Sequence, residues 1–175
     1  MRMLKGAILV LGGLFLTITL LSLLIPAKVR VSRGVVIAAP ASKVFAQISN
    51  LRNWKHWQPV FKADTGAIHY STGSTLAGSY CEWYSAGKKN SFRLTAADAS
   101  SIRMVLSREG ENDWQNMISV LPLSTPDSVQ VEWQATTRLK WYPWEKFYGI
   151  FLEKVTGPGF EEALNNLKAY AEQSQ

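Results

Sequence analysis

A tyrosine and a glutamate spaced two residues apart are the clearest candidates for chemistry in this sequence. Tyr80 and Glu82 lie in the segment LAGSYCEWY, and a β-strand would place both on one face because alternate strand residues point the same way. Inside a cavity, a phenol and a carboxylate are an acid and a base for an aldol-type cyclisation or a dehydration. The other phase of this strand, 76–84, points Cys81 and Trp83 inward and leaves Glu82 in solvent. The pattern does not decide between the two phases.

An asparagine within an apolar set is the second candidate. Asn116 shares a strand face with Trp114 and Ile118 in the segment WQNMISV. A buried amide must find hydrogen-bond partners, so Asn116 bonds a ligand, a water molecule or a neighbouring side chain. Both a ligand-binding and a locally bonded asparagine agree with the pattern.

Other chemistries find little support. His56, His69 and Cys81 are not at metal-ligand spacing, no GxSxG elbow is present, and neither histidine has an orienting acid nearby in the sequence. The glycines of STGSTLAG and SAGKK fit neither a phosphate loop nor a dinucleotide fingerprint and indicate hairpin turns. Lys55 alone in NWKHW is no basic patch. We therefore expect no metal, no cofactor and no nucleic-acid partner.

Two tryptophans three residues apart, Trp54 and Trp57, stand out in NLRNWKHWQP. Together with Leu51 they share roughly one face of a short helix that Pro59 ends. Large aromatic side chains at that spacing either pack inward and close one end of the fold, or line the mouth of a pocket. Both interpretations remain open from the sequence.

The first residues form a segment apart from the rest. The stretch GAILVLGGLFLTITLLSLLI, from Gly6 to Ile25, has no charge over twenty residues, and as a helix it would span about 30 Å, one hydrocarbon thickness. It is longer than a signal-peptide core, and Ile25 stands where a cleavage site prefers a small residue. The sequence therefore predicts a retained membrane anchor at residues 1–27 and one soluble domain at residues 28–175.

The charges around this segment are nearly balanced. Arg2 and Lys5 precede it, and Lys28, Arg30 and Arg33 follow it, so the positive-inside rule gives little direction. Removing Arg2 and Lys5 from the 19 basic residues leaves 17 against 13 acidic ones, a net charge of +4 for the domain. Such a mild excess is ordinary beside a membrane. A short basic head before a long apolar run is most typical of an uncleaved signal anchor, which would place the domain on the far side of the membrane.

The remaining elements are predicted from the spacing of apolar residues and from the turn residues between them. Alternating valines predict a first strand in KVRVSRGVVI, and an apolar stripe after Pro40 predicts a helix. Six short strands with turn signals between them come next. A long terminal helix follows, with a kink or break expected at Gly157-Pro158-Gly159. The six later strands are expected in AIHY, LAGSYCEWY, SFRLTAA, IRMVLSR, WQNMISVLPL and VQVEWQATTRL.

This order resembles the helix-grip fold of the START-like or SRPBCC superfamily, in particular its polyketide cyclase/dehydrase-type members with an N-terminal membrane anchor in bacteria. The likeness is carried by VVIAAPASKVFAQISNLRNWKHWQP and by WYPWEKFYGIFLEKVTGPGFEEALNNLK. It implies an α+β fold in which a curved antiparallel sheet of about seven strands wraps around the long C-terminal helix, with one transmembrane helix added. It also implies a single-pass protein of the bacterial inner membrane, with the domain on the periplasmic side.

The resemblance further implies a cavity between sheet and helix for a hydrophobic or amphipathic molecule such as a lipid, isoprenoid or polyketide. No catalytic motif of a cyclase carries over to this chain. We therefore expect a membrane-tethered binding protein. Two alternatives are a cyclase or dehydratase using Tyr80, Glu82 or Asn116, and a non-catalytic interaction module with a filled cavity and an apolar patch around Trp141 and Trp144. The expected cavity residues are Tyr80, Trp83, Trp114, Asn116, Ile118, Val131, Trp133, Phe147 and Phe151, with Trp54 and Trp57 at the pocket mouth.

Overall fold

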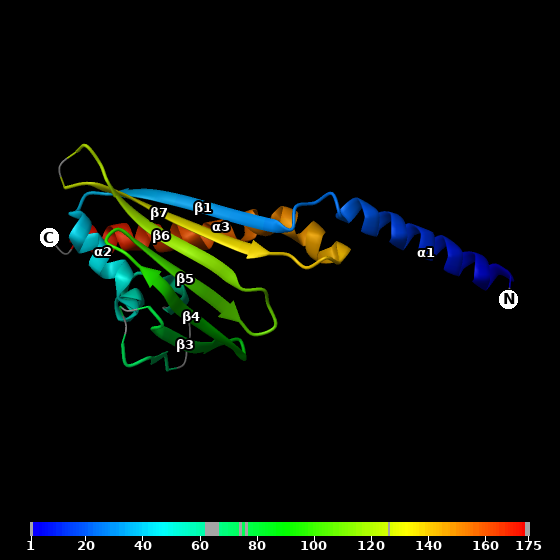
Figure 1. Ribbon diagram of the computed structural model, residues 1–175, viewed down its shortest axis with the longest axis horizontal. Helices are drawn as coiled ribbons and strands as arrows, with labels where there is room; N and C mark the ends of the chain where they lie inside the picture. The colour runs from blue at the N-terminus through cyan, green and yellow to red at the C-terminus, as the bar shows by residue number, and fades with distance from the viewer. Residues whose placement is uncertain (1, 62–66, 74, 76, 126, 174–175) are drawn as a thin grey trace.

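A computed structural model describes residues 2–61, 67–73, 75, 77–125 and 127–173. A helix α1 (Arg2–Ser22) stands apart from a domain in which a curved sheet covers one long helix (Figure 1). The predicted architecture is confirmed: an N-terminal apolar helix, a seven-stranded antiparallel sheet and a long C-terminal helix. The structure also places the two short helical segments between the first and second strands, as the sequence indicated.

The sheet has the strand order β1-β7-β6-β5-β4-β3-β2, and every neighbouring pair is antiparallel. The first strand therefore closes against the last, while the strands between them follow in chain order through short hairpins. The strands are β1 (Lys28–Ile37), β2 (His69–Tyr70), β3 (Tyr80–Ser85), β4 (Lys88–Ala97), β5 (Ser101–Arg108), β6 (Trp114–Pro122) and β7 (Val129–Arg138).

The long helix α3 (Pro143–Gln173) runs through the expected break without interruption. Pro158 lies on the exposed side of the helix, where water can replace the hydrogen bond that a proline removes. Gly157 is buried because Arg33 of β1 crosses it there, donating from Nε to Glu161 at 2.6 Å and from Nη1 to Glu153 at 3.1 Å. The expected break in this helix is therefore wrong, and this junction clamps α3 to the edge of the sheet.

The two glycines around Pro158 should respond oppositely to alanine. A Cβ at Gly159 would meet nothing within 4 Å, so Gly159→Ala should stabilise the protein by about 0.5–1 kcal/mol through helix propensity. A Cβ at Gly157 would lie 2.4 Å from Arg33 Nη2 and displace the bound guanidinium, so Gly157→Ala should give no gain or a loss. Urea unfolding of both variants in detergent micelles measures the difference, and equal gains would contradict the clamp.

An aromatic cluster fills the end of the domain that is far from α1. It forms between the inner face of the sheet, α2 (Ala41–Ser49), the short segments η1 (Leu51–His56) and η2 (Pro59–Phe61), and the second half of α3. Asn50 caps the start of η1, because its side chain accepts a hydrogen bond from the Arg52 N–H. Ring contacts link the members of the cluster, which are Trp54, Trp57, Phe61, Trp83, Phe92, Trp133 and Phe160.

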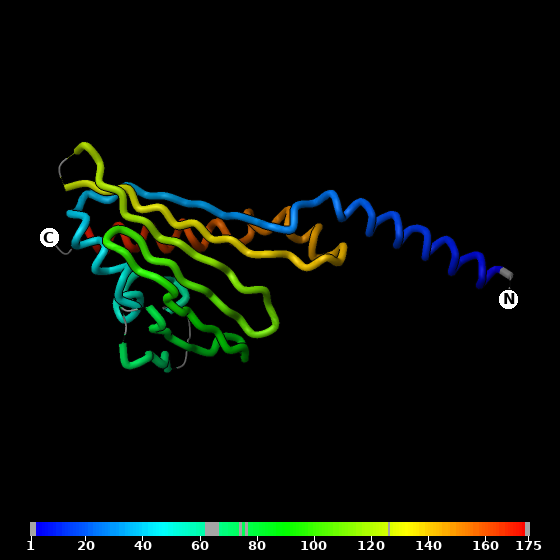
Figure 2. The backbone as a smooth tube through the Cα atoms, in the orientation of Figure 1, coloured from blue at the N-terminus to red at the C-terminus, as the bar shows by residue number. Residues whose placement is uncertain are grey.

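The joint between α1 and the domain is short and bonded. The Leu139 N–H donates to the Ala27 carbonyl at 2.7 Å, and Lys146 Nζ donates to the Ile25 carbonyl at 2.9 Å. Lys146 is only 6% exposed, which is unusual for a lysine and requires such a partner. The backbone trace shows α1 leaving the domain at the end where α3 begins (Figure 2).

Candidate functional site

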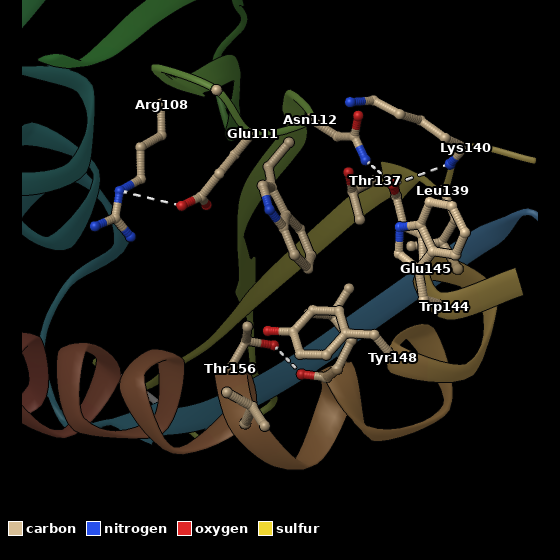
Figure 3. A pocket seen from close by; sticks show the side chains of 14 residues that line it. Arg108, Glu111, Asn112, Thr137, Leu139, Lys140, Trp144, Glu145, Tyr148 and Thr156 are labelled. Carbon is tan, nitrogen blue, oxygen red and sulfur yellow. Dashed lines mark hydrogen bonds and ion pairs between the residues drawn. The ribbon is translucent and has the colours of Figure 1, made fainter. Parts of the chain in front are cut away.

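A cavity of about 540 Å³ lies between the inner face of the sheet and the first half of α3, at the end of the domain nearest α1. The turn after β5 converges on it with the end of β7 and the start of α3, which follow one another in the sequence (Figure 3). In an antiparallel sheet the end of one strand lies beside the start of the next, so the end of β5, the start of β6 and the end of β7 meet at the same end of the sheet. The lining residues are Arg108, Gly110, Glu111, Asn112, Trp114, Thr137, Leu139, Lys140, Trp144, Glu145, Tyr148, Leu152, Val155 and Thr156.

More of the wall of the cavity is apolar than polar, and its two threonine hydroxyl groups are already bonded to backbone carbonyls. The Thr137 hydroxyl donates to the Asp113 carbonyl at 2.9 Å, and the Thr156 hydroxyl donates to the Leu152 carbonyl at 2.7 Å. Leu139 and Leu152 are buried in the wall. A ligand would therefore meet mostly carbon, which is the surface that binds hydrophobic molecules.

The charged groups of the cavity lie at its rim. Arg108 Nε is 3.4 Å from Glu111 Oε1, an ion pair without a well-formed hydrogen bond, and Lys140 lies on the opposite side in Figure 3. Glu145 accepts from the Lys140 N–H at 2.9 Å and from the Asn112 amide. The rim can therefore offer a polar group to the head of an amphipathic molecule while the interior holds its apolar part.

Glu145 holds the turn after β5 against the start of α3. Burial raises the pKa of its carboxyl, but hydrogen bonds from the Lys140 N–H and the side chains of Asn112 and Tyr142 outweigh it, so the pKa is lowered from 4.5. A carboxyl whose pKa is lower in the folded state stabilises the fold above its unfolded pKa, and this stabilisation is lost as the pH falls through the folded pKa.

Glu145→Gln should therefore flatten the acid side of the stability profile. The wild type is expected to lose more free energy of unfolding than Glu145→Gln as the pH falls from neutral through the ordinary range of a carboxyl, about 4. Asp98 and Glu132, whose pKa values are also lowered by hydrogen bonds, contribute equally to both proteins and cancel in the comparison. Urea unfolding across this range tests it, with the exposed Glu162→Gln as control. Parallel profiles for wild type and Glu145→Gln would contradict the prediction.

One predicted cavity residue, Trp114, lines this cavity. Five other predicted strand residues are buried elsewhere, in or beside the aromatic cluster, where neighbouring side chains fill the space. Asn116 is bonded locally, since its Oδ1 accepts from Trp133 Nε1 at 3.0 Å and its amide donates to the Trp114 carbonyl at 2.9 Å. The buried set is Trp83, Asn116, Ile118, Val131 and Trp133.

The aromatic residues expected at the mouth and on the helix lie elsewhere. Trp54 and Trp57 are both 0% exposed, so they form no rim. They pack inward against Phe92 and Trp133 and close the far end of the fold, the other interpretation of the pair. Phe147 and Phe151 of α3 are 40% and 58% exposed and are not among the lining residues, because the helix turns these positions away from the sheet.

The open phase of the strand 76–84 is settled by β3. Cys81 and Trp83 are buried on the inner face, and Tyr80 lies on the other face, where Arg93 stacks over its ring. Glu82 pairs with Lys89 at 2.9 Å. Leu76, in the expected strand, lies outside the described residues. Tyr80 and Glu82 therefore do not form an acid–base pair in the cavity.

The sequence did not indicate most of the lining residues. Arg108, Asn112, Lys140 and Glu145 sit in turns or at element ends, where no periodic pattern marks a face. The signal that could have indicated them is that the chain leaves β5 and β7 at the same end of an antiparallel sheet. Among the described residues, no cluster of three or more histidine, cysteine, aspartate or glutamate side chains is arranged to hold a metal.

The family of proteins described as polyketide cyclase / dehydrase and lipid transport matches residues 27–172 of this chain. The chain belongs to this family. The matched region covers every strand, α2 and almost all of α3, and it begins just after α1 ends. No curated protein sequence matches the chain. Because the family description covers both enzymes and lipid transport, membership alone does not decide between them.

Solved structures show the same fold at low identity. A START superfamily protein from Mycobacterium smegmatis is 18% identical over 84% of this chain and 99% of its own, with a TM-score of 0.64. The Zhui aromatase/cyclase from a Streptomyces species is 17% identical over 83% of this chain and 94% of its own, with a TM-score of 0.64. Norcoclaurine synthase from Thalictrum flavum, in complex with dopamine and hydroxybenzaldehyde, is 14% identical over 85% of this chain and 88% of its own, also with a TM-score of 0.64. These neighbours establish the fold and not the activity.

Proposed function

We propose that this protein is a membrane-tethered binding protein for a hydrophobic or amphipathic small molecule, such as a lipid, isoprenoid or polyketide-like compound. Residues 1–27 are the anchor and residues 28–175 are the binding domain. The observation that carries the proposal is the cavity of about 540 Å³, with its apolar walls and charged rim, at the end of the domain where α1 leaves.

The position of the cavity supports a tethered ligand-binding role. The stretch Met3–Ser22 is long and apolar enough to cross a membrane, and nearly all of its side chains are exposed; Ser22, where the helix meets the domain, is buried. A lipid-like ligand is scarce in water and concentrated in the bilayer, and a tether raises its effective concentration at the cavity. The family description, which includes lipid transport, agrees with such a cargo.

The described residues favour binding over catalysis. Tyr80 and Glu82 face away from the interior, and Asn116 accepts a hydrogen bond from Trp133. The three residues expected to serve a cyclase, Tyr80, Glu82 and Asn116, are therefore not among the lining residues of the cavity. What the cavity offers is shape, carbon surface and a polar rim, which are the requirements of a carrier.

A matched pair of tryptophan substitutions tests this proposal. Val155 is 60% exposed and lines the cavity, whereas Val36 of β1 is 50% exposed and is not among the lining residues. In the full-length protein in detergent micelles, Val155→Trp should weaken binding of a dansylated undecanoic acid by about tenfold or more, on the order of 1.4 kcal/mol, because the indole occupies the cavity. Val36→Trp should bind this probe as the wild type does.

Solvent extraction and mass spectrometry of co-purified molecules provide the second readout. The wild type and Val36→Trp should carry the same apolar compound near one per chain, and Val155→Trp should carry less of it. Circular dichroism checks that all three proteins fold alike. Equal probe binding and equal co-purified compound in both variants would place any ligand elsewhere and overturn the proposal.

A further inference from the structure

The exposed apolar side chains of the domain are concentrated at the start of α3. Of the twelve large apolar residues after Ile25 that are exposed in the described chain, seven fall within residues 141–155. Scattered exposed apolar residues are normal, but a contiguous set marks a binding surface. We call this set the α3 apolar face; it consists of Trp141, Trp144, Phe147, Tyr148, Ile150, Phe151 and Val155.

The charged residues at the start of this stretch are turned away from the face. Between Trp141 and Val155 the chain has four charges: Glu145 and Lys146 at the start, and at the end Glu153, which pairs with Arg33, and the exposed Lys154. Glu145 is bonded to the Lys140 N–H and to Asn112, and Lys146 is 6% exposed with its Nζ on the Ile25 carbonyl. A charged side chain near lipid costs the least free energy when it is bonded to a partner and points into the protein. Glu145 and Lys146 meet both conditions.

The face begins at the level where α1 leaves the domain. Ala27 accepts from the Leu139 N–H, so the chain just before Trp141 is bonded to the chain just after α1 (Figure 1). When α1 crosses a bilayer, the residues that follow it lie in the interfacial layer, and Trp141, Tyr142 and Trp144 lie beside them. Tryptophan and tyrosine are the residues enriched in that layer, because their rings are apolar and their N–H or O–H groups remain hydrated.

We propose that the start of α3 is seated in the interfacial layer of the same bilayer that holds α1, so that lipid covers the end of the α3 apolar face nearest α1, around Trp141 and Trp144. This inference rests on the proposed function, because it requires α1 to span a membrane. Trp144, Tyr148 and Val155 belong both to the face and to the wall of the cavity. Since the face and the cavity share a wall, the cavity opens beside the lipid, and an apolar ligand reaches it laterally along α3 without crossing bulk water.

Site-specific fluorescence quenching tests this placement in the full-length protein. The native Cys81 is 0% exposed and burial raises the pKa of its thiol to about 12, so a single introduced cysteine takes a maleimide label without any change at Cys81. Trp141→Cys carries the label on the face, and Leu121→Cys carries it on β6, at an exposed apolar position outside the face. Leu11→Cys in α1 marks the membrane interior.

The three proteins are reconstituted in vesicles of phosphatidylcholine and phosphatidylglycerol that contain nitroxide-labelled lipid. The label at position 141 should be quenched several-fold more strongly than the label at position 121. Equal, weak quenching at positions 141 and 121 while position 11 is quenched would overturn this inference alone. Disulfide-linked dimers of the unlabelled Trp141→Cys protein, together with an unquenched label at position 141 in the labelled protein, would also overturn it, because a second copy would then cover the face.

These outcomes are separable from failure of the proposed function. If position 141 is quenched but Val155→Trp binds the dansylated probe normally, the membrane contact stands and the cavity assignment falls. If position 11 itself is not quenched, α1 is not inserted in the bilayer, and both proposals are overturned.

Discussion

Replacing Trp133 by alanine is expected to destabilise the protein by about 3–5 kcal/mol, a large share of the 5–15 kcal/mol typical of a domain. Trp133 is 2% exposed and makes edge contacts with Trp54 and Phe160 at centroid distances of 5.9 and 5.0 Å. Its removal leaves a cavity at the centre of the aromatic cluster and an unpaired Asn116 Oδ1. Urea unfolding of the full-length protein in detergent micelles, followed by circular dichroism, measures the loss.

Two further results identify the role of Trp133. Trp133→Phe keeps most of the ring but loses the N–H donor, so it should cost only about 1–3 kcal/mol. Binding of the dansylated undecanoic acid, corrected for the folded fraction, should be unchanged in Trp133→Phe, because the indole is outside the cavity wall. A stable Trp133→Ala variant that no longer binds the probe would instead place the ligand at Trp133.

The fold was predictable because its signals are local. Alternation of apolar and polar residues over six to ten positions marks the longer strands, and turn residues separate them. The presence and the order of the strands therefore follow from these two local signals. The long helix was also predictable, but its continuity at Pro158 was not. Nor was the contact beside it, where Arg33, more than a hundred residues away, approaches α3 closely and requires a glycine at position 157.

The position of the cavity was not predictable, because it depends on which side chains fill the space between sheet and helix. In the sequence, Trp54, Trp57 and Trp133 have the same apolar pattern as cavity-lining residues. Only their packing against one another shows that they fill the space between the sheet and α3 at the far end of the domain. The phase of β3 was undetermined for a related reason. Both of its faces carry aromatic residues, Trp83 on one and Tyr80 and Tyr84 on the other, so burial could not be read from the alternation.

Lys146→Met should loosen the joint between α1 and the domain and cost about 1–3 kcal/mol, because it removes the donor to the Ile25 carbonyl at a buried position. Methionine keeps a similar length of apolar chain, so packing is largely retained and the lost hydrogen bond dominates. Lys154→Met, at an exposed position of the same helix, should stay within about 0.5 kcal/mol of the wild type. Urea unfolding in detergent micelles compares the two variants.

The same substitution separates a joint that orients the domain from one that only adds stability. With the label at position 141 in vesicles, Lys146→Met should lower quenching by nitroxide lipid while circular dichroism remains that of a folded domain, and Lys154→Met should leave quenching unchanged. Unchanged quenching in Lys146→Met would show that the Leu139–Ala27 hydrogen bond holds the orientation by itself. A fall in quenching would instead mean that Lys146 holds α3 beside the end of α1, and thereby the cavity beside the lipid from which its ligand would come.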